Sequence, residues 1–196
     1  MSRSNRERTE ATKQALIDAA RILFVRDGYA ETATPDIVQT AGVTRGALYH
    51  HFEDKKALFR AVVEQEAEAV AVAIEERSLS SGSAYDRLLA GASAYFDAMA
   101  IAGRTRLLLL DGPAVLGAQA IGAIDGEHAE ASLREGLAEF LAEAGGPDAL
   151  LPQLTRLLSA AFDRAALAIE AGGDRRDYEQ AVETLIAGLG GDHLLR

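Results

Sequence analysis

Two helix starts lie only ten residues apart in the N-terminal third of the chain, which leaves room for short helices and a tight turn. Thr34 offers a capping hydroxyl and precedes a proline, whose fixed backbone angle suits a first helical residue. Gly42 is typical of a helix end, and Thr44 offers a second cap after one apolar residue. The spacing therefore predicts one short helix up to Gly42 and another up to His51 or Phe52. This is the helix-turn-helix arrangement.

Longer helices are predicted on both sides of this pair. Apolar residues spaced three and four apart predict an amphipathic helix over Thr9 to Asp27, with Gly28 as its stop. Asp54 can cap a further helix that runs to about Arg77. Residues 1–54 are therefore interpreted as one small helical domain.

The second short helix contains residues that stability alone does not favour. A glycine inside a helix, here Gly46, costs about 1 kcal/mol relative to alanine, but its missing side chain lets the helix approach another surface. Ala47, Leu48 and Phe52 can face the core, which leaves hydrogen-bond donors and flat rings that suit phosphates and base edges. The side chains expected to project outward are Thr44, Arg45, Tyr49, His50 and His51.

Lys55 and Lys56 occupy the first turn of the following helix, where the helix dipole disfavours cations and a DNA phosphate would remove the conflict. Each feature also has an ordinary explanation: Gly46 can relieve helix packing, Tyr49 can belong to the core, and the lysines can be solvated. The combination of caps, turn glycine, open helix and cationic helix start favours DNA binding. Residues 1–8, with three arginines, are interpreted either as an arm that adds DNA contacts or as a disordered terminus.

Three runs of residues carry a resemblance to a known family. They are Thr-Pro-Asp-Ile at 34–37, Ala-Gly-Val-Thr-Arg-Gly-Ala-Leu-Tyr-His-His-Phe at 41–52, and Asp-Lys-Lys-Ala-Leu at 54–58. Together they resemble the DNA-binding domain of TetR-family transcriptional repressors, over Thr9 to about Val63. The resemblance implies an all-helical homodimer with a divergent, ligand-sensing C-terminal domain.

The same resemblance implies roles for individual residues. It implies DNA-backbone contacts by Thr34, Tyr49, His51 and Lys55, and positions against the major groove for Thr44, Arg45, Gly46 and His50. Because neither Gly46 nor Ala47 offers a side-chain hydrogen bond, base readout is expected to rest mainly on Arg45, with guanine as its partner.

Charge is distributed unevenly along the chain. The whole chain has a net charge of −10, which at first sight argues against a DNA-binding protein. Residues 1–60 hold 10 Lys+Arg and 8 Asp+Glu, net +2, whereas residues 61–196 hold 10 and 22, net −12. The two parts are therefore expected to do different jobs, with DNA contacted by the N-terminal part.

Helix follows helix over residues 55–196, and no strand pattern is convincing. Breaks rich in glycine, proline, serine and aspartate fall at 78–83, 103, 111–113, 145–147 and 172–174. Amphipathic helices are predicted over 85–102 and 128–144, and a short buried helix over 107–110 is followed by a break. We expect an all-α fold, with residues 55–196 as a helical domain that the resemblance assigns to ligand binding and dimerisation.

Two late helices are unusually apolar, and each has two interpretations. Their apolar faces can form the domain's own core, or they can pair with a second copy of the chain as a four-helix bundle. The resemblance favours the bundle. The candidate interface residues are Leu154, Leu158, Phe162, Val182, Leu185, Ile186 and Leu189.

A ligand pocket leaves little trace in the sequence. Apolar residues of the middle helices can line a cavity or fill a core with equal ease. The candidate pocket residues are Phe96, Met99, Leu110, Leu133 and Phe162. Few aromatic residues, no tryptophan and an acidic domain favour an apolar or cationic ligand over a flat polyanion.

Several function classes are disfavoured. The chain has no cysteine, no phosphate-binding glycine loop, no nucleophile elbow and no His-Glu-x-x-His zinc motif, so we expect no catalytic residue, no metal and no cofactor. No apolar run suits a membrane helix or an export signal, so a cytoplasmic location is expected. The leading hypothesis is a ligand-responsive repressor that binds a palindromic operator as a homodimer. The alternatives are a helical enzyme that processes a small molecule, and a DNA-binding protein without a sensor.

Overall fold

The structure, a computed structural model, describes residues 5–79, 82–146 and 148–190. Helices are the regular elements of these residues, in which no strand occurs, so the all-α prediction is confirmed. The chain divides into two compact units, residues 1–66 with 106–121 and residues 67–105 with 122–196. None of the described helices has the length and apolar character needed to cross a membrane.

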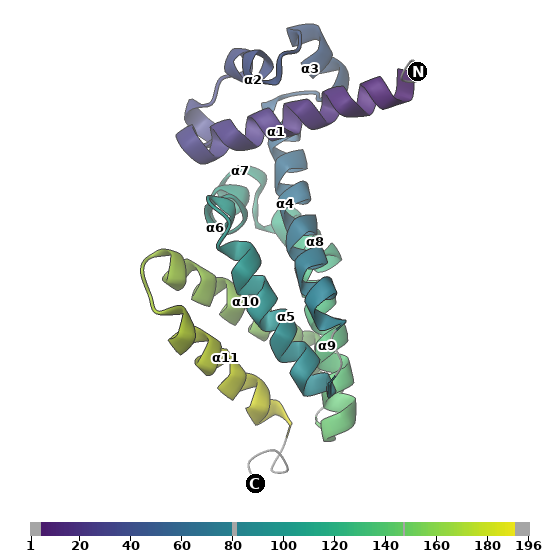
Figure 1. Cartoon of the computed structure of the whole chain (residues 1–196), viewed down its shortest axis with the longest axis vertical. Helices are drawn as coiled ribbons and strands as arrows, with labels where there is room; N and C mark the ends of the chain where they lie inside the picture. Colours follow the sequence, from purple (N-terminus) through teal and green to yellow (C-terminus); the bar gives the residue numbers. More distant parts are fainter. Residues whose placement is uncertain (1–4, 80–81, 147, 191–196) are drawn as a thin grey trace. The chain divides into compact units, whose positions relative to one another are not determined.

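The first unit consists of helices from two stretches of the chain. From the N-terminal stretch come α1 (Asn5–Glu31), α2 (Thr34–Ala41), α3 (Arg45–His51) and the beginning of α4 (Lys55–Ser78), as Figure 1 shows. From the second stretch come the π-helical turn η1 (Leu107–Asp111) and α7 (Gly112–Leu116). The predicted boundary after Asp54 coincides with the start of α4, whose residues up to Glu66 belong to this unit.

Aromatic and aliphatic side chains form the core of the first unit. Phe24 of α1 packs edge-on against Phe59 of α4, with ring centroids 5.1 Å apart, and Ile37 and Leu48 are fully buried. Removing side chains of this size from water is the main stabilising contribution in a small helical domain. The short helices α2 and α3 are therefore held by packing, since helices of their length are marginal alone.

Most local signals in the helix-turn-helix segment are confirmed. Gly42 ends α2 in the left-handed conformation, with a φ of 67°. The Thr44 hydroxyl accepts a hydrogen bond from the backbone N–H of Ala47 at 3.2 Å, and Asp54 caps α4 at Ala57 N at 2.7 Å. The prediction that Thr34 caps α2 is wrong, because Thr34 is already helical and Ala33 holds the cap position without a side-chain bond.

α1 begins earlier than predicted, at Asn5. The predicted stop at Gly28 is confirmed, because the backbone leaves the helical conformation there, with a φ of 82° and a ψ of 165°, and a short second segment of α1 then continues to Glu31. The hydroxyl of Thr32 donates to the Gly28 carbonyl at 2.7 Å and so satisfies an acceptor at the kink. Of the predicted arm, residues 5–8 are helical in α1, and residues 1–4 lie outside the described residues.

The break predicted at residues 111–113 is also wrong. The π-helical turn η1 runs directly into α7, and the helical path is interrupted only at Gly117, whose φ is 92°. Pro113 stands in the first turn of α7, directly after the π-helical turn, where the Gly112 N–H donates to the Leu107 carbonyl. Within the predicted buried stretch Leu107 is buried, but Leu110 is 50% exposed.

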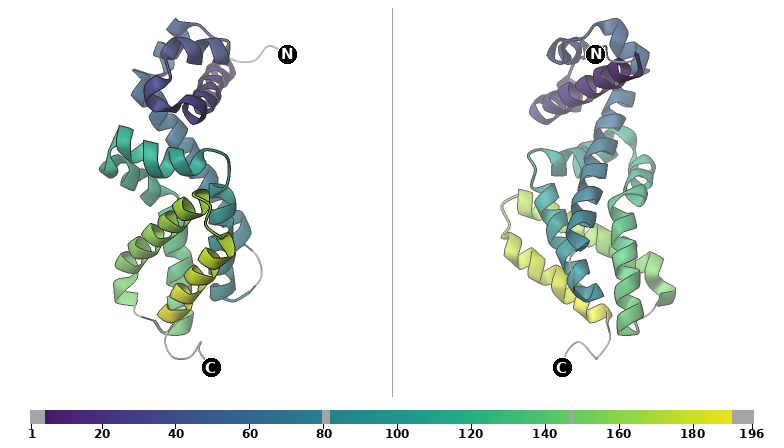
Figure 2. Two further views of the ribbon diagram at one scale, coloured as in Figure 1. Left: turned by 90° about the vertical axis from the view of Figure 1, so that its left-hand side faces the viewer. Right: turned by 45° about the vertical axis from the view of Figure 1, so that its right-hand side comes forward.

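The second unit contains the remaining helices. They are the rest of α4, α5 (Ala84–Met99), most of the short α6 (Arg104–Arg106), most of α8 (Ala118–Glu127), α9 (Ala129–Ala144), the 3-10 turn η2 (Asp148–Leu150), α10 (Leu151–Glu170) and α11 (Arg175–Leu189). Figure 2 shows α10 and α11 as an antiparallel pair. The predicted helices over 85–102 and 128–144 correspond to α5 and α9, whereas α8 was not expected.

Packing in the second unit follows a simple order. α9 packs against both α5 and α10, and α11 packs against α10 and α5. Tyr95 and Phe96 of α5 meet Phe162 of α10, with ring centroids 5.4 and 5.7 Å from that of Phe162. This aromatic cluster joins α10 to α5, and two of its members, Tyr95 and Phe162, line the cavity described below.

Candidate nucleic-acid interface and ligand cavity

α3 presents one buried and one exposed face. Leu48 is completely buried and anchors the helix, whereas Arg45, Gly46, Tyr49 and His50 are exposed. A Cβ atom added at Gly46 would have only the Thr44 hydroxyl within 4 Å, at 3.8 Å. Packing within the described chain therefore does not require a glycine at position 46, and the explanation from helix packing loses its support.

Tyr49 joins α3 to the start of α2. Its ring is 45% exposed, and the Arg45 guanidinium carbon lies 5.5 Å from the ring centroid. Hydrogen bonding to Arg45, and then to Thr34, lowers the pKa of the Tyr49 hydroxyl. Three of the predicted DNA-contacting residues, one from α2 and two from α3, therefore form one exposed polar group.

The two histidines at the end of α3 pack against each other, with ring centroids 5.2 Å apart. Burial, followed by the charge of His50, lowers the pKa of His51. A neutral His51 can still donate one N–H to a phosphate, as the resemblance implies. In the described residues, no group of three or more His, Cys, Asp and Glu side chains is arranged to hold a metal ion.

Lys55, the first residue of α4, contacts the C-terminal end of α1. Its Nζ donates to the carbonyls of Tyr29 at 2.8 Å, Thr32 at 2.9 Å and Ala30 at 3.4 Å, and it lies 4.4 Å from the centroid of the Tyr29 ring. These carbonyls supply the partial negative charge that a cation in the first turn of α4 needs. A DNA phosphate is therefore not required to explain Lys55, and Lys56 beside it is exposed.

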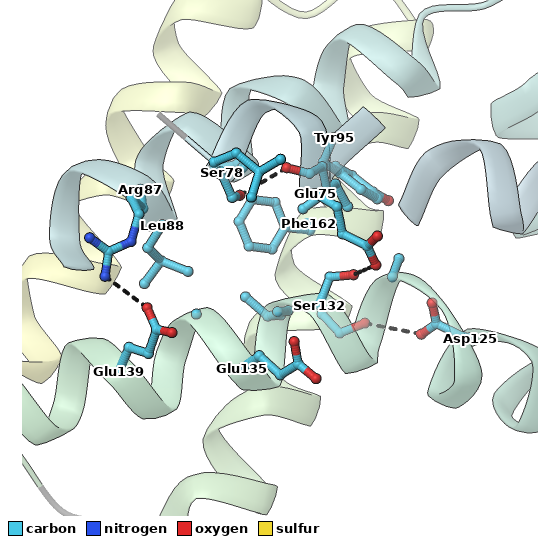
Figure 3. Close-up of a pocket in the computed structure, with 18 of the residues that line it drawn as sticks. Glu75, Ser78, Arg87, Leu88, Tyr95, Asp125, Ser132, Glu135, Glu139 and Phe162 are labelled. Carbon is cyan, nitrogen blue, oxygen red and sulfur yellow. Dashed lines mark hydrogen bonds and ion pairs between the residues drawn. The ribbon is translucent and has the colours of Figure 1, made fainter. Parts of the chain in front are cut away.

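A cavity of about 540 Å³ lies within the second unit, between α4, α5, α8, α9 and α10 (Figure 3). Its apolar lining includes Ile74, Leu88, Leu133 and Phe162. Its polar lining consists of Glu75, Ser78, Arg87, Tyr95, Asp125, Ser132, Glu135, Glu139, Ser159 and Asp163. The size and the mixed lining are those of a small-molecule site.

The predicted pocket residues are distributed unevenly around this cavity. Leu133 and Phe162 line it. Phe96 and Met99 are buried on α5 but are not among the lining residues. Leu110 belongs to the first unit, on η1, and is half exposed.

Two carboxyl groups in the cavity were not anticipated from the sequence. The Tyr95 hydroxyl donates to Asp163 at 2.7 Å, and the Ser159 hydroxyl donates to Asp125 at 3.3 Å. Burial, reinforced by the charge of Asp163, raises the pKa of Asp125 to about 6, and burial also raises the pKa of Asp163. The sequence signal for this pair was Asp163, which lies beside the apolar stripe of α10. The sequence alone does not distinguish such an aspartate from a surface residue.

The predicted interface residues on α10 and α11 fall into two groups. Leu158, Phe162, Val182 and Ile186 are buried within the chain itself. Leu154 and Leu189 are partly exposed, and Leu185 is 53% exposed. Leu157 of α10, which was not predicted, is 69% exposed. The exposed apolar side chains of this helix pair are thus centred on Leu157 and Leu185 rather than on the buried residues.

Comparison with known proteins agrees with both units. Residues 16–62 match the model of bacterial regulatory proteins of the tetR family, and residues 85–191 match the tetracyclin repressor-like C-terminal domain. The chain belongs to the TetR family.

Curated relatives match about a third of this chain. The regulator AcrR of Shigella flexneri is 41% identical over 64 residues, which is 33% of this chain and 30% of AcrR. The TetC protein of transposon Tn10 from Escherichia coli is 45% identical over 60 residues, 31% of this chain and 30% of TetC. The chain thus spans about a third of the length of such relatives.

A solved structure resembles the whole chain. A TetR-family transcriptional regulator from Pectobacterium atrosepticum is 28% identical, with a TM-score of 0.73, over 95% of this chain and 97% of the other. The regulator LfrR of Mycobacterium smegmatis, solved with proflavine, shares the fold at 21% identity, with a TM-score of 0.63 over 90% and 94% of the two chains.

Proposed function

We propose that the chain is a ligand-responsive transcriptional repressor that binds a palindromic operator as a homodimer. The observation that carries this proposal is the exposed face of α3, where Arg45 and Tyr49 form one polar group with Thr34 of α2 and the position of Gly46 is open. Guanidinium and hydroxyl groups are the donors that base edges and phosphates accept from. Membership of the TetR family supports the same function.

The proposal assigns base contacts and DNA-backbone contacts to different residues of the N-terminal unit. Arg45 reads a guanine in the major groove, with Thr44, Gly46 and His50 lying against the groove. Thr34, Tyr49, His51 and Lys55 hold the DNA backbone. A dimer would place two copies of α3 about 34–36 Å apart, on successive major grooves of a palindrome.

The exposed leucines support a dimer formed through α10 and α11. Leu157 and Leu185 are large apolar side chains left in solvent by the single chain. Leu154 lies about one turn from Leu157 on α10, Leu189 lies about one turn from Leu185 on α11, and both remain partly exposed. Pairing with a second copy would remove this surface from water in a four-helix bundle.

The cavity supports regulation by a small molecule. α4 contributes Ile74, Glu75 and Ser78 to the cavity lining, while its first residues belong to the unit that contains α3. A ligand that favours one conformation of this helix would shift the population of DNA-competent dimers. To change that population substantially, it needs a few kcal/mol of differential affinity for the two conformations.

The competing functions have weaker support. A DNA-binding protein without a sensor would leave the cavity unexplained. A helical enzyme would leave the open face of α3 unexplained, and curated relatives that match about a third of the chain are named transcriptional regulators. We therefore propose a regulator without enzymatic activity, which acts on DNA in the cytoplasm.

Selection of bound sequences from a random duplex library tests the proposal. The expected result is an enriched palindrome whose half-sites lie about one helical turn apart, bound with an affinity that falls steeply with salt. Failure to enrich any sequence, with and without candidate effectors, would overturn it.

A paired variant tests the dimer. The Leu157→Glu, Leu185→Glu double variant should sediment as a monomer and bind the selected duplex far more weakly. Val72→Glu is the matched control, because Val72 is an exposed apolar residue of α4 that does not line the cavity. A double variant that remains dimeric would place the interface elsewhere.

A further inference from the structure

The cavity in the second unit has an unbalanced charge. Five acidic side chains line it, and Arg87 is the one basic side chain among the described lining residues. The Arg87 guanidinium is already paired, at 2.8 Å with Glu139 and at 2.7 Å with the carbonyl of Gly82. The carboxylates that remain uncompensated are Glu75, Asp125, Glu135 and Asp163.

Asp125 and Asp163 are the two most informative of these groups. They come from α8 and α10, and their side-chain partners are uncharged hydroxyls, Ser159 for Asp125 and Tyr95 for Asp163. Among the described residues, no lysine, arginine or histidine forms an ion pair with either carboxylate. Both carboxylates are partly buried, so ionising them without a cation nearby is costly, and the charge of Asp163 raises that cost for Asp125.

A purely structural role explains this arrangement poorly. Apolar residues of similar size would fill the same space without the desolvation cost, and a lysine would neutralise the pair. Burial raises the pKa of both groups, which shows that the fold resists their ionised forms. Groups that a fold holds at a cost to its stability are more often functional than structural.

The polar groups are distributed so that the cavity has two different ends. In Figure 3 the Arg87–Glu139 pair lies on the opposite side of the cavity from Asp125. Between these two sides Phe162 supplies apolar surface, but Glu75, Ser132 and Glu135 lie there as well. One side is therefore neutralised by its own ion pair, whereas the rest of the cavity combines apolar surface with carboxylates that form no ion pair among the described residues.

We propose that this cavity binds an organic cation with an apolar body, whose charged group lies against Asp125 and Asp163. The inference rests on the proposed ligand-responsive function and specifies the chemical class of its effector. The apolar body would contact this apolar surface and gain the free energy of leaving water. The cation would supply the counter-charge that the two carboxylates lack, while an organic anion would be repelled by them.

Two pairs of probes of opposite charge test the class directly. Tetraphenylphosphonium and tetraphenylborate have nearly the same size and shape, and octylammonium and octanoate provide a flexible pair. Each probe is titrated by calorimetry into the full-length protein at pH 7.5. We expect saturable binding of at least one cation, at one site per chain, at least about tenfold tighter than binding of its anionic counterpart.

Variants locate the site. In the Asp125→Asn, Asp163→Asn double variant, cation affinity should fall by about tenfold or more, because both counter-charges are removed with almost no change of volume. Glu127→Gln is the matched control, since Glu127 is an exposed acid on α8, like Asp125, but does not line the cavity. It removes one negative charge from the same helix and should leave the affinity unchanged.

Several outcomes would overturn the inference. They are binding of neither cation, equal binding of cation and anion, and equal effects of the double variant and of Glu127→Gln. Binding of the wild-type protein to the selected DNA duplex, measured without probe, reports separately on the proposed regulator. A protein that binds the selected duplex but binds the cationic and anionic probes equally well would still be a regulator, with an effector of a different chemical class.

Discussion

The exposed face of α3 and the cavity of the second unit are both candidate binding sites, but they use charge in opposite ways. On α3 the polar side chains Arg45, Tyr49 and His50 stand in solvent, where water screens each charge. In the cavity, Asp125 and Asp163 are buried enough that their pKa values are raised. A single charge therefore counts for more in the cavity than on α3. The net charge of the whole chain, −10, describes neither site.

The two sites also differ in how they are supported. On α3 the interacting residues are close in sequence, since Thr44 caps Ala47 and Arg45 lies over Tyr49. In the cavity, Tyr95 and Asp163 are 68 residues apart and are brought together by packing of α5 against α10. Substitutions of the exposed polar side chains of α3 should therefore affect DNA binding with little change in stability. Substitutions in the cavity should affect ligand binding and stability together.

The largest expected effect lies on α3. Arg45→Ala should weaken binding to the selected duplex by about 1–3 kcal/mol per half-site and relax the sequence preference at one position in each half-site. The unfolding free energy should change little, because Arg45 is exposed. Competitive binding to duplexes varied at each position measures this. Arg26→Ala, which removes an exposed arginine paired with Asp27, is the control. An unchanged sequence preference would exclude Arg45 as the base reader.

The next largest effect tests the cost of the buried carboxylate. The folded chain raises the pKa of Asp125 from 3.8 to about 6, so it binds the proton more tightly than the unfolded chain does. Ionised Asp125 therefore lowers the unfolding free energy by its full amount above about pH 6, and this effect disappears as the pH falls toward 4. Asp125→Asn should raise the unfolding free energy by up to about 3 kcal/mol at pH 7.5 and by little at pH 4. Denaturant unfolding at both pH values measures it, with Glu127→Gln as the control. A gain that is equal at both pH values would contradict this origin.

A variant of Lys55 tests whether this residue stabilises the fold, contacts DNA, or does both. Lys55→Met should lower the unfolding free energy by about 2 kcal/mol, because three carbonyls at the end of α1 lose a charged donor. Lys56→Met removes the same charge from an exposed neighbour and should leave stability unchanged. The dependence of DNA affinity on salt is then measured for both variants. If Lys55 also binds a phosphate, its variant alone should reduce the salt slope by about 1 for each phosphate that it no longer neutralises.

The same physical contrast explains what the sequence could predict. The ends of α2, α3 and α4 are encoded by Gly42, Thr44 and Asp54, which act on backbone groups within three residues. The break predicted at residues 111–113 is wrong because a proline can start a helix as readily as it can end one, and Pro113 stands in the first turn of α7. The exposed face of α3 was predictable because its residues are nearly consecutive.

The cavity was not predictable, since its lining comes from five helices and depends on how they pack. Asp163 follows Phe162 directly, yet the sequence alone cannot tell that its carboxyl meets the hydroxyl of Tyr95. Leu158 and Ile186 show the converse difficulty. Both lie on apolar stripes suited to an interface, but both are buried in the core of the chain itself.

A smaller effect concerns the pH dependence of cation binding. A cation pairs with the ionised form of Asp125, whose pKa is about 6, so its affinity should rise with pH and level off above neutrality. Asp163, whose pKa is also raised by burial, lies in the same region, and Glu130 and Tyr95 face it as well. Affinity for octylammonium should be about tenfold lower at pH 5 than at pH 7.5. Calorimetry at the two pH values measures this, and the Asp125→Asn variant should show a flatter profile. A flat wild-type profile would exclude Asp125 as the counter-charge.

The smallest effect separates stability from function at a single position. Gly46→Ala should raise the unfolding free energy by about 0.5–1 kcal/mol, because alanine favours helix and the added Cβ meets nothing closer than 3.8 Å. The same variant should weaken DNA binding, because a methyl group would stand where α3 approaches the major groove. Denaturant unfolding and duplex binding, measured on one preparation, report the two effects. Gly122→Ala is the control, since a Cβ added there meets nothing within 4 Å and α8 lies outside the predicted DNA surface. If Gly46→Ala stabilised the protein and left DNA affinity intact, the glycine would serve neither packing nor recognition.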